Sequence, residues 1–322
     1  MKTMLNLTTC REDLDRFPDA GALSSILDGF DGVELMCLGE DERHIIQSGQ
    51  VIGLHMNCFP YWLDFWNGDI SALISEFDTS HNCERCYGGM DRSALIRHYE
   101  RDLALAHAYN AEYVVFHVSD SSARESFTWN YRHSSEEVID AACELLNILF
   151  KNEDGSVMLL LENLWQPGLT MTTPDMTKRL LDGVAYRNKG IMLDTGHLLH
   201  TNTAIRTQEE GLEYIGRMLD THGSLCDNIR GIHLNQSLTG EYCERTISKP
   251  PKLGDTYAQR CEQMFWHAFT VDQHLPFTCE EIDKLIARVA PQYLTYEFIT
   301  TDSEQHRMFI EAQRLALAGL EL

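Results

Sequence analysis

Six short apolar runs of the sequence end on residues of the kinds that bind metal ions in proteins. These residues are His55, His117, Glu162, Asp194, His233 and Glu297. A core that buried unpaired carboxylates and imidazoles together would lose on the order of several kcal/mol for each group. Direct coordination of a divalent cation removes that penalty. The pattern therefore favours a metal site over a set of unrelated core residues.

A seventh residue of these kinds stands nearby in the sequence. His197 follows Asp194 by three residues, and a short turn there would point both side chains at one cluster. The imidazole-rich set permits zinc, whereas the oxygen-rich subset suits manganese or magnesium equally.

Eight apolar runs alternate along the chain with longer segments of helical spacing. The runs are 4–8, 32–36, 51–56, 113–118, 157–162, 190–193, 229–234 and 293–298. Between them, segments such as 91–109, 135–150 and 207–221 repeat Leu, Ile and Ala at three and four residues, which is typical of amphipathic helices. This alternation predicts an α/β fold, a single (β/α)8 TIM barrel over residues 1–322, with a doubly wound open sheet as the main competitor. The candidate ligands would then lie at the carboxyl ends of the strands, where such barrels carry their chemistry.

Two stretches depart from the alternation, and both follow the carboxyl ends of expected strands. Residues 57–91 form an aromatic-rich loop region, in which Trp62 and Trp66 are candidates for stacking on a substrate ring or for packing at one end of the barrel or at a subunit interface. Residues 236–271 form a long loop after strand seven, which would lie over the carboxyl-end face of the barrel.

Charge and composition restrict the partners. The 322 residues hold 26 Lys and Arg against 49 Asp and Glu, a formal net charge of -23. Such a field opposes binding to nucleic acid and to anionic membranes. No apolar run reaches the length of a membrane span, and the first ten residues lack a secretory signal, so we expect a cytoplasmic protein. Cys83 and Cys86 have CxxC spacing without a second pair, and we interpret them as loop residues.

Four segments of the sequence resemble a known group of barrels. These are LENLWQPG around Glu162, MLDTGHLL around Asp194, IHLNQS around His233 and DQHLPFTCEEID around Asp272. They are similar to the xylose isomerase-like TIM barrel superfamily, which includes endonuclease IV and many sugar isomerases and epimerases. The resemblance covers most of the chain, from about the third strand to the eighth.

The sugar isomerase and epimerase branch implies a site with one divalent ion. Its ligands would be Glu162, Asp194, His233 and Glu297, of which the two glutamates would also transfer protons next to a carbonyl. His197, and with it His55 and His117, would contact the substrate. We expect an isomerase or epimerase of this kind, with a small sugar or polyol as substrate, because the acidic surface opposes a nucleic-acid substrate. A homo-oligomer is compatible with the sequence.

The endonuclease IV branch implies a three-metal site and phosphoester hydrolysis. All nine positions of that pattern are filled here, by the six residues at the run ends together with His197, Asp272 and His274. Asp272 and His274 are two residues apart, so an extended segment would project them the same way. The two branches of the resemblance together imply one to three divalent ions. Against the epimerase branch, Thr239 stands where its members usually carry an arginine. Thr278 and Glu280 replace glycines that usually follow the Asp-x-His segment. A barrel that binds metal or a metabolite without turnover is the third alternative.

Three further polar residues receive structural interpretations. Glu34 lies at the end of the second expected strand. We interpret it as a member of an ion pair inside the barrel, with a substrate contact as the alternative. We interpret His200 and His267 as solvated histidines.

Overall fold

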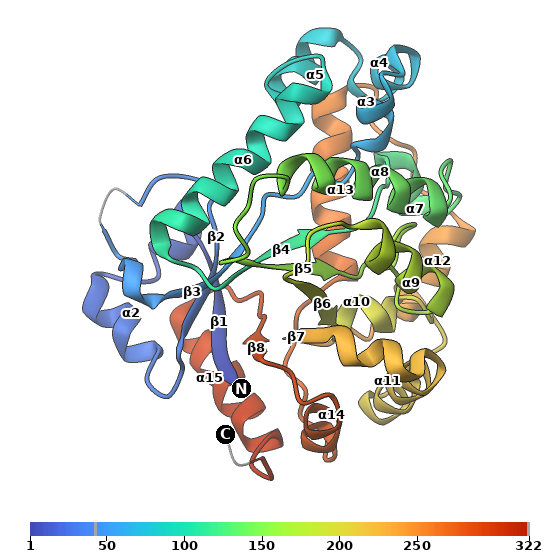
Figure 1. Cartoon of the computed structure of the whole chain (residues 1–322). Helices are drawn as coiled ribbons and strands as arrows, with labels where there is room; N and C mark the ends of the chain where they lie inside the picture. Colours follow the sequence, from blue (N-terminus) through green and yellow to red (C-terminus); the bar gives the residue numbers. More distant parts are fainter. Residues whose placement is uncertain (42–43, 321–322) are drawn as a thin grey trace.

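The computed structural model describes residues 1–41 and 44–320 of the chain. Its eight strands form one closed parallel barrel in the order β1 to β8, and helices surround that barrel (Figure 1). The strands are β1 Lys2–Thr8, β2 Gly32–Met36, β3 Val51–His55, β4 Tyr113–His117, β5 Met158–Glu162, β6 Lys189–Asp194, β7 Ile229–Leu234 and β8 Tyr293–Tyr296. The predicted (β/α)8 fold is confirmed.

Helices occupy the connections between the strands. The α-helices are α1 Arg11–Leu14, α2 Ala20–Ile26, α3 Leu63–Asn67, α4 Ile70–Phe77, α5 Ser80–Tyr87, α6 Arg92–Tyr109, α7 Ala123–Thr128, α8 Ser135–Leu149, α9 Pro174–Gly183, α10 Thr195–His200, α11 Gln208–His222, α12 Gly240–Ser248, α13 Tyr257–Val271, α14 Ile282–Val289 and α15 Ser303–Ala316. Two 3-10 helices, η1 Ser48–Gln50 and η2 Gly223–Asn228, precede β3 and β7. Among the described residues, no helix combines the length and apolar character needed to cross a membrane.

Alternation along the strands creates two separate cores. On β5, Leu159 and Leu161 belong to the large core that lies between the strands and the helices, whereas Leu160 belongs to a second core cluster. That inner cluster includes Tyr113 and Met192, both fully buried. Because strand side chains point alternately to opposite faces, the nearly continuous apolar runs serve both cores at once.

The long helices begin at polar caps. Ser134 accepts a hydrogen bond from the backbone N–H of Glu137 at the start of α8, and the Glu137 side chain accepts one from the backbone N–H of Ser134. Thr207 and Glu210 make the same reciprocal pair at the start of α11. Such pairs satisfy N–H groups that the first turn of a helix leaves free.

The two stretches expected as loops contain helices instead. Residues 57–91 hold α3, α4 and α5, and residues 236–271 hold α12 and α13. Cys83 and Cys86 therefore lie on a helix, α5, and not in a loop. Asp69 and Thr79 cap α4 and α5 through their side chains, which is the local signal for helix starts in this stretch. The many aromatic residues of this stretch suggested a loop, so the two caps were not recognised.

The strand register brings the polar strand ends together. His117 on β4 is level with Glu162 on β5, and Asp194 on β6 is level with His233 on β7. All four residues lie at the carboxyl ends of their strands. The register therefore turns residues that are far apart in sequence into neighbours at one end of the barrel.

Candidate metal centre

Nine residues at the carboxyl end of the barrel form three groups, each with ligand atoms within 4.8 Å of one another. The groups are His55, His117 and Glu162; Glu162, Asp194, His233 and Glu297; and His197, Asp272 and His274. We call them the first, central and third groups. The structure thus brings together all nine residues singled out in the sequence, and Glu162 belongs to two groups.

The first group is a nearly equilateral triangle. His55 Nε2 lies 3.1 Å from His117 Nε2 and 3.1 Å from Glu162 Oε2, and the third edge, from His117 Nε2 to Glu162 Oε2, is also 3.1 Å. His55 Nδ1 lies 2.9 Å from the carbonyl oxygen of Met56, which orients the ring. A tetrahedral zinc ion with ligands at about 2.0–2.1 Å places those ligands about 3.3 Å apart, so the triangle fits such an ion.

The central group surrounds the other oxygen of Glu162. His233 Nδ1 lies 3.2 Å from Glu162 Oε1 and 3.2 Å from Glu297 Oε2. Asn235 donates through Nδ2 to Asp194 Oδ2 at 2.7 Å and to Glu297 Oε2 at 3.3 Å. Three carboxylates and one imidazole form a donor set that suits a divalent ion, since water alone cannot compensate so many charges in a buried site.

The third group gathers around one oxygen of Asp272. His197 Nε2 lies 3.0 Å from Asp272 Oδ2, and His274 Nε2 lies 2.8 Å from the same atom. The other oxygen, Oδ1, lies 3.3 Å from His200 Nε2 and accepts a hydrogen bond of 3.3 Å from Ser237 Oγ. One carboxylate oxygen therefore faces the candidate ligands while the second is held by the surrounding protein.

The buried charges shift one another's pKa values strongly. Burial lowers the pKa of His117, but the Glu162 carboxylate outweighs burial and raises that pKa to about 10. Burial likewise lowers the pKa of His274, but the Asp272 carboxylate outweighs burial and raises that pKa to about 9. Burial raises the pKa of Asp194 to about 7. Burial also acts against the charged form of Glu162, yet His117 and His233 hold its pKa well below the usual value. Without ions, the site balances its carboxylates with protonated imidazoles.

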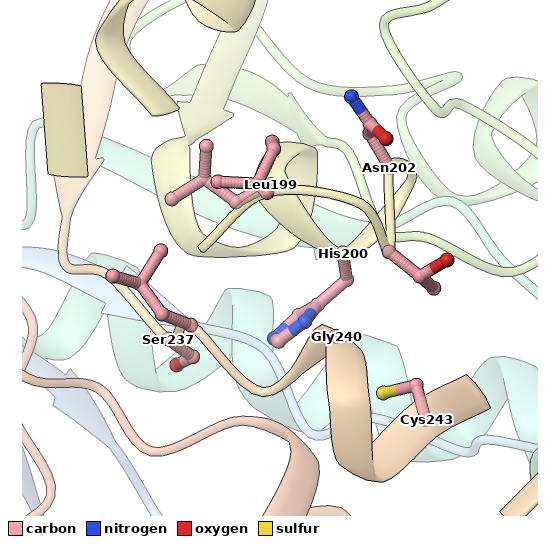
Figure 2. A pocket seen from close by; sticks show the side chains of 9 residues that line it. Leu199, His200, Asn202, Ser237, Gly240 and Cys243 are labelled. Carbon is pink, nitrogen blue, oxygen red and sulfur yellow. The ribbon is translucent and has the colours of Figure 1, made fainter. Parts of the chain in front are cut away.

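His200 and His267 are not solvated, in contrast to the expectation from sequence. His200 is 3% exposed and contacts Asp272, and His267 is 6% exposed between Tyr242 and the carbonyl oxygen of Ser126. His200 and Ser237 line a cavity of about 10 Å³, room for about one water molecule, and Figure 2 shows their side chains. The burial of His200 and His267 could not be predicted from the local sequence, because it results from the packing of helices.

Trp62 and Trp66 lie in the core beside this end of the barrel. They are 2% and 1% exposed, and their indole N–H groups donate to the carbonyl oxygen of Ser119 and to Glu144. This burial favours the packing interpretation over a substrate contact. A different tryptophan borders the third group: the half-buried Trp165, whose ring centre lies 5.3 Å from that of His197 and 4.8 Å from that of His200.

Sequence reasoning missed residues that hold the candidate ligands in place. Asn163 exchanges two hydrogen bonds with the backbone of Asp194, and Asn235 binds the Asp194 carboxylate. Each follows directly after its strand, so polar residues one step beyond the strand end were the available signal. Glu34, expected in an ion pair inside the barrel, has its Oε1 2.8 Å from His233 Nε2.

Comparisons with known proteins agree with the architecture. A family model for the xylose isomerase-like TIM barrel matches residues 27–284. Endonuclease IV from Thermus thermophilus has a similar structure, with a TM-score of 0.54, 14% identity and coverage of 99% of this chain and 100% of that one. A putative xylose isomerase from Rhodospirillum rubrum gives a TM-score of 0.56 at 14% identity, over 100% of both chains.

An L-ribulose 3-epimerase gives a TM-score of 0.52 at 11% identity, covering 98% of this chain and 91% of that one. No curated protein matches the sequence. At these identities, the likeness to the three solved structures concerns the fold alone.

Proposed function

Because the chain belongs to the xylose isomerase-like TIM barrel family, we propose that it is a metal-dependent enzyme that hydrolyses a small phosphoester at a site for up to three divalent ions. The observation that carries this proposal is the arrangement of nine ligand-type residues in three groups, with the two oxygens of Glu162 facing different groups. A site for one ion would leave two complete groups of ligand-type residues without an ion. This favours a multinuclear centre over the single-ion centre expected from sequence.

Charge supports an anionic substrate for such a centre. Five buried carboxylates belong to it or touch it, those of Glu34, Glu162, Asp194, Asp272 and Glu297. Three divalent ions would exceed these negative charges and leave the site net positive, which attracts a phosphate group. A single ion, with His117 and His274 still protonated, would leave the site close to neutral, which suits an uncharged polyol. The number of bound ions therefore separates the two reaction classes.

The substrate in this proposal is a small molecule. A net charge of -23 opposes a nucleic acid, because binding to a phosphate backbone depends on many Lys and Arg contacts. One phosphoester group needs only the local positive charge of the centre. The Trp165 ring, packed against His197 and His200, is placed to limit water access on one side of the third group.

Each group of side chains has a role in this proposal. The nine residues hold the ions, Asn163 and Asn235 fix the position of Asp194, and Ser237 and His200 fix that of Asp272. Bound divalent ions would supply Lewis-acid stabilisation of the charge that develops on the phosphoryl oxygens.

Isomerisation or epimerisation of a sugar is the second candidate, and the composition of the central group favours it. Glu162, Asp194, His233 and Glu297 form the oxygen-rich set that the sequence indicated for a single ion. In that case His55, His117 and His197 would contact the substrate. The two glutamates would then move a proton on and off carbon.

The first test is the metal content of protein purified without a chelator or a nickel column, measured by elemental mass spectrometry. We expect two or three ions per chain, zinc or manganese, and hydrolysis of small phosphomonoesters or phosphodiesters. His55→Ala should remove one ion and the hydrolysis. A single ion, together with solvent deuterium exchange into a ketose, would replace this proposal by the second candidate. Bound metal without turnover of any phosphoester or sugar would indicate a binding protein.

A further inference from the structure

Glu34 lies inside the barrel, below the candidate metal centre, and its contacts reach three other strands. The Glu34 side chain on β2 is 1% exposed, and its Oε1 lies 2.8 Å from Nε2 of the fully buried His233 on β7. Its Oε2 accepts hydrogen bonds from the Tyr113 hydroxyl on β4 at 2.6 Å and from Thr295 Oγ1 on β8 at 3.0 Å. A glycine on β3, Gly53, leaves room for the Tyr113 ring, since a Cβ there would lie 2.1 Å from a ring atom.

The two nitrogens of His233 face different surroundings. Nδ1 lies 3.2 Å from oxygens of both Glu162 and Glu297. Of the acidic residues that pair with this ring, Glu34 is the one that lies close to Nε2. A metal ion binds a ring nitrogen that carries no proton, so the proton of a neutral, metal-binding His233 must sit on Nε2. Nε2 is buried and makes no hydrogen bond of good geometry in this structure, although a buried N–H needs an acceptor. Glu34 Oε1, at 2.8 Å, is close enough to accept from it after a small rotation of either side chain.

We infer that Glu34 is a positioning residue, which holds the His233 ring with Nδ1 turned toward the central group and the proton on Nε2. This inference rests on the metal centre of the proposed function but not on the reaction. Tyr113 and Thr295 hold Glu34 in turn, because both donate to the oxygen that does not face His233. Carboxylates in this position fix the orientation of a metal-binding histidine and increase its basicity.

Replacement by glutamine separates this role from simple packing. Glu34→Gln keeps the shape of the side chain but removes its charge. The amide also has one oxygen and one NH2 group, so it cannot accept from His233 on one side and from two hydroxyl groups on the other without rearrangement. We expect the affinity for the central ion to fall about 10–100-fold, the range found for such outer partners. The first and third groups should keep their ions.

The measurement is a competition titration of the full-length protein with zinc and a chromophoric chelator, which reports affinity without any activity assay. The matched control is Asp64→Asn. Asp64 is also buried, accepts from the Tyr61 hydroxyl at 2.6 Å and lies 3.1 Å from His133 Nε2, but touches none of the nine candidate ligands. We expect this control to retain all ion affinities. Nitrogen-15 NMR of labelled histidines should show Nε2–H for His233 in the zinc-loaded wild type.

A second variant keeps the test possible if Glu34→Gln does not fold. Tyr113→Phe keeps the ring and removes one donor to Glu34, so it should weaken the same ion about threefold or more. Wild-type affinity for all ions in folded Glu34→Gln, or an Nδ1–H tautomer in the zinc-loaded wild type, would overturn the inference while the proposed function stands. Ion binding that depends on Glu34 in a protein that hydrolyses no phosphoester would overturn the function and support the inference. A wild type that binds no zinc would overturn both.

Discussion

At the scale of single residues, the candidate centre is a balance of buried charges. His117 and His274, with pKa values of about 10 and 9, carry protons at neutral pH in the metal-free protein because Glu162 and Asp272 face them. Ions and protons therefore compete for the same imidazole nitrogens. The nine residues behave as a coupled set, and each ion changes the charge felt by the next.

Metal binding should release protons and should tighten as the pH rises. At pH 7, His117 and His274 both hold protons in the metal-free protein, and an ion must displace them. At pH 9, about half of the His274 side chains have lost their proton. Calorimetric titration with zinc, repeated in buffers of different ionisation enthalpy, gives the number of protons released. We expect at least one per ion in the first and third groups. A result independent of the buffer would contradict this charge assignment.

Glu162 differs from the other candidate ligands because its two oxygens face separate groups. Glu162→Gln should therefore lower the content of bound metal by two ions, whereas Asp272→Asn should lower it by one. Elemental mass spectrometry of both variants, after dialysis against the same zinc buffer, compares them directly. Equal losses would mean that Glu162 does not bridge two ions.

At the scale of elements, the segment between β3 and α6 supports the barrel rather than the substrate. Trp66 on α3 is buried, and its N–H donates to Glu144 on α8 at 2.8 Å. Trp66→Ala should lower the free energy of unfolding by about 3–5 kcal/mol, through the cavity that it leaves.

Urea titration checks that value, with Trp266→Ala as the control because Trp266 is 64% exposed. The control should change stability by less than about 0.5 kcal/mol. If Trp66→Ala left stability unchanged and raised KM, a substrate contact would be the better reading.

The turn from β6 into α10 depends on a glycine. Asp194 caps α10 by accepting from the backbone N–H of His197, and a Cβ on Gly196 would lie 1.9 Å from Asn235 Oδ1. Gly196→Ala should displace Asn235 from Asp194, destabilise the fold by about 1–3 kcal/mol and weaken the central ion. Thermal melts and zinc titration measure both effects. Gly49→Ala, with no atom within 4 Å of the added Cβ, should show neither.

At the scale of the whole molecule, the buried charges of the candidate centre couple the stability of the fold to bound metal. Ions that bind only the folded state add about 4 kcal/mol of stability per site at a concentration of about 1,000 times Kd. Removal of metal by a chelator should therefore lower Tm by several degrees.

The chelated protein should melt at still lower temperature at pH 9 than at pH 7. His117 and His274 have folded-state pKa values above the unfolded value of about 6.5, so their stabilising contribution falls progressively as the pH rises from about 6.5 and is lost above about 9 to 10. Scanning calorimetry at both pH values, with and without zinc, makes the comparison. A melting temperature that does not respond to chelation would argue against bound metal.

The sequence by itself was sufficient for the strands and for the types of the candidate ligands. Apolar runs such as 157–162 are local patterns, and a residue such as Glu162 at the end of one is recognisable because a buried charge needs a partner. The alternation of runs and helical segments then predicts the barrel. These inferences depend on residues close together in the chain.

Only the tertiary structure decided how those residues combine. The three groups, the sharing of Glu162, the contact of Glu34 with His233 and the burial of His200 depend on strand register and helix packing between distant segments. The helices in 57–91 and 236–271 were missed for a different reason, because aromatic density and length suggested loops although caps such as Asp69 and Thr256 mark helix starts there. Long-range contacts, which no local pattern contains, set the features of the candidate centre.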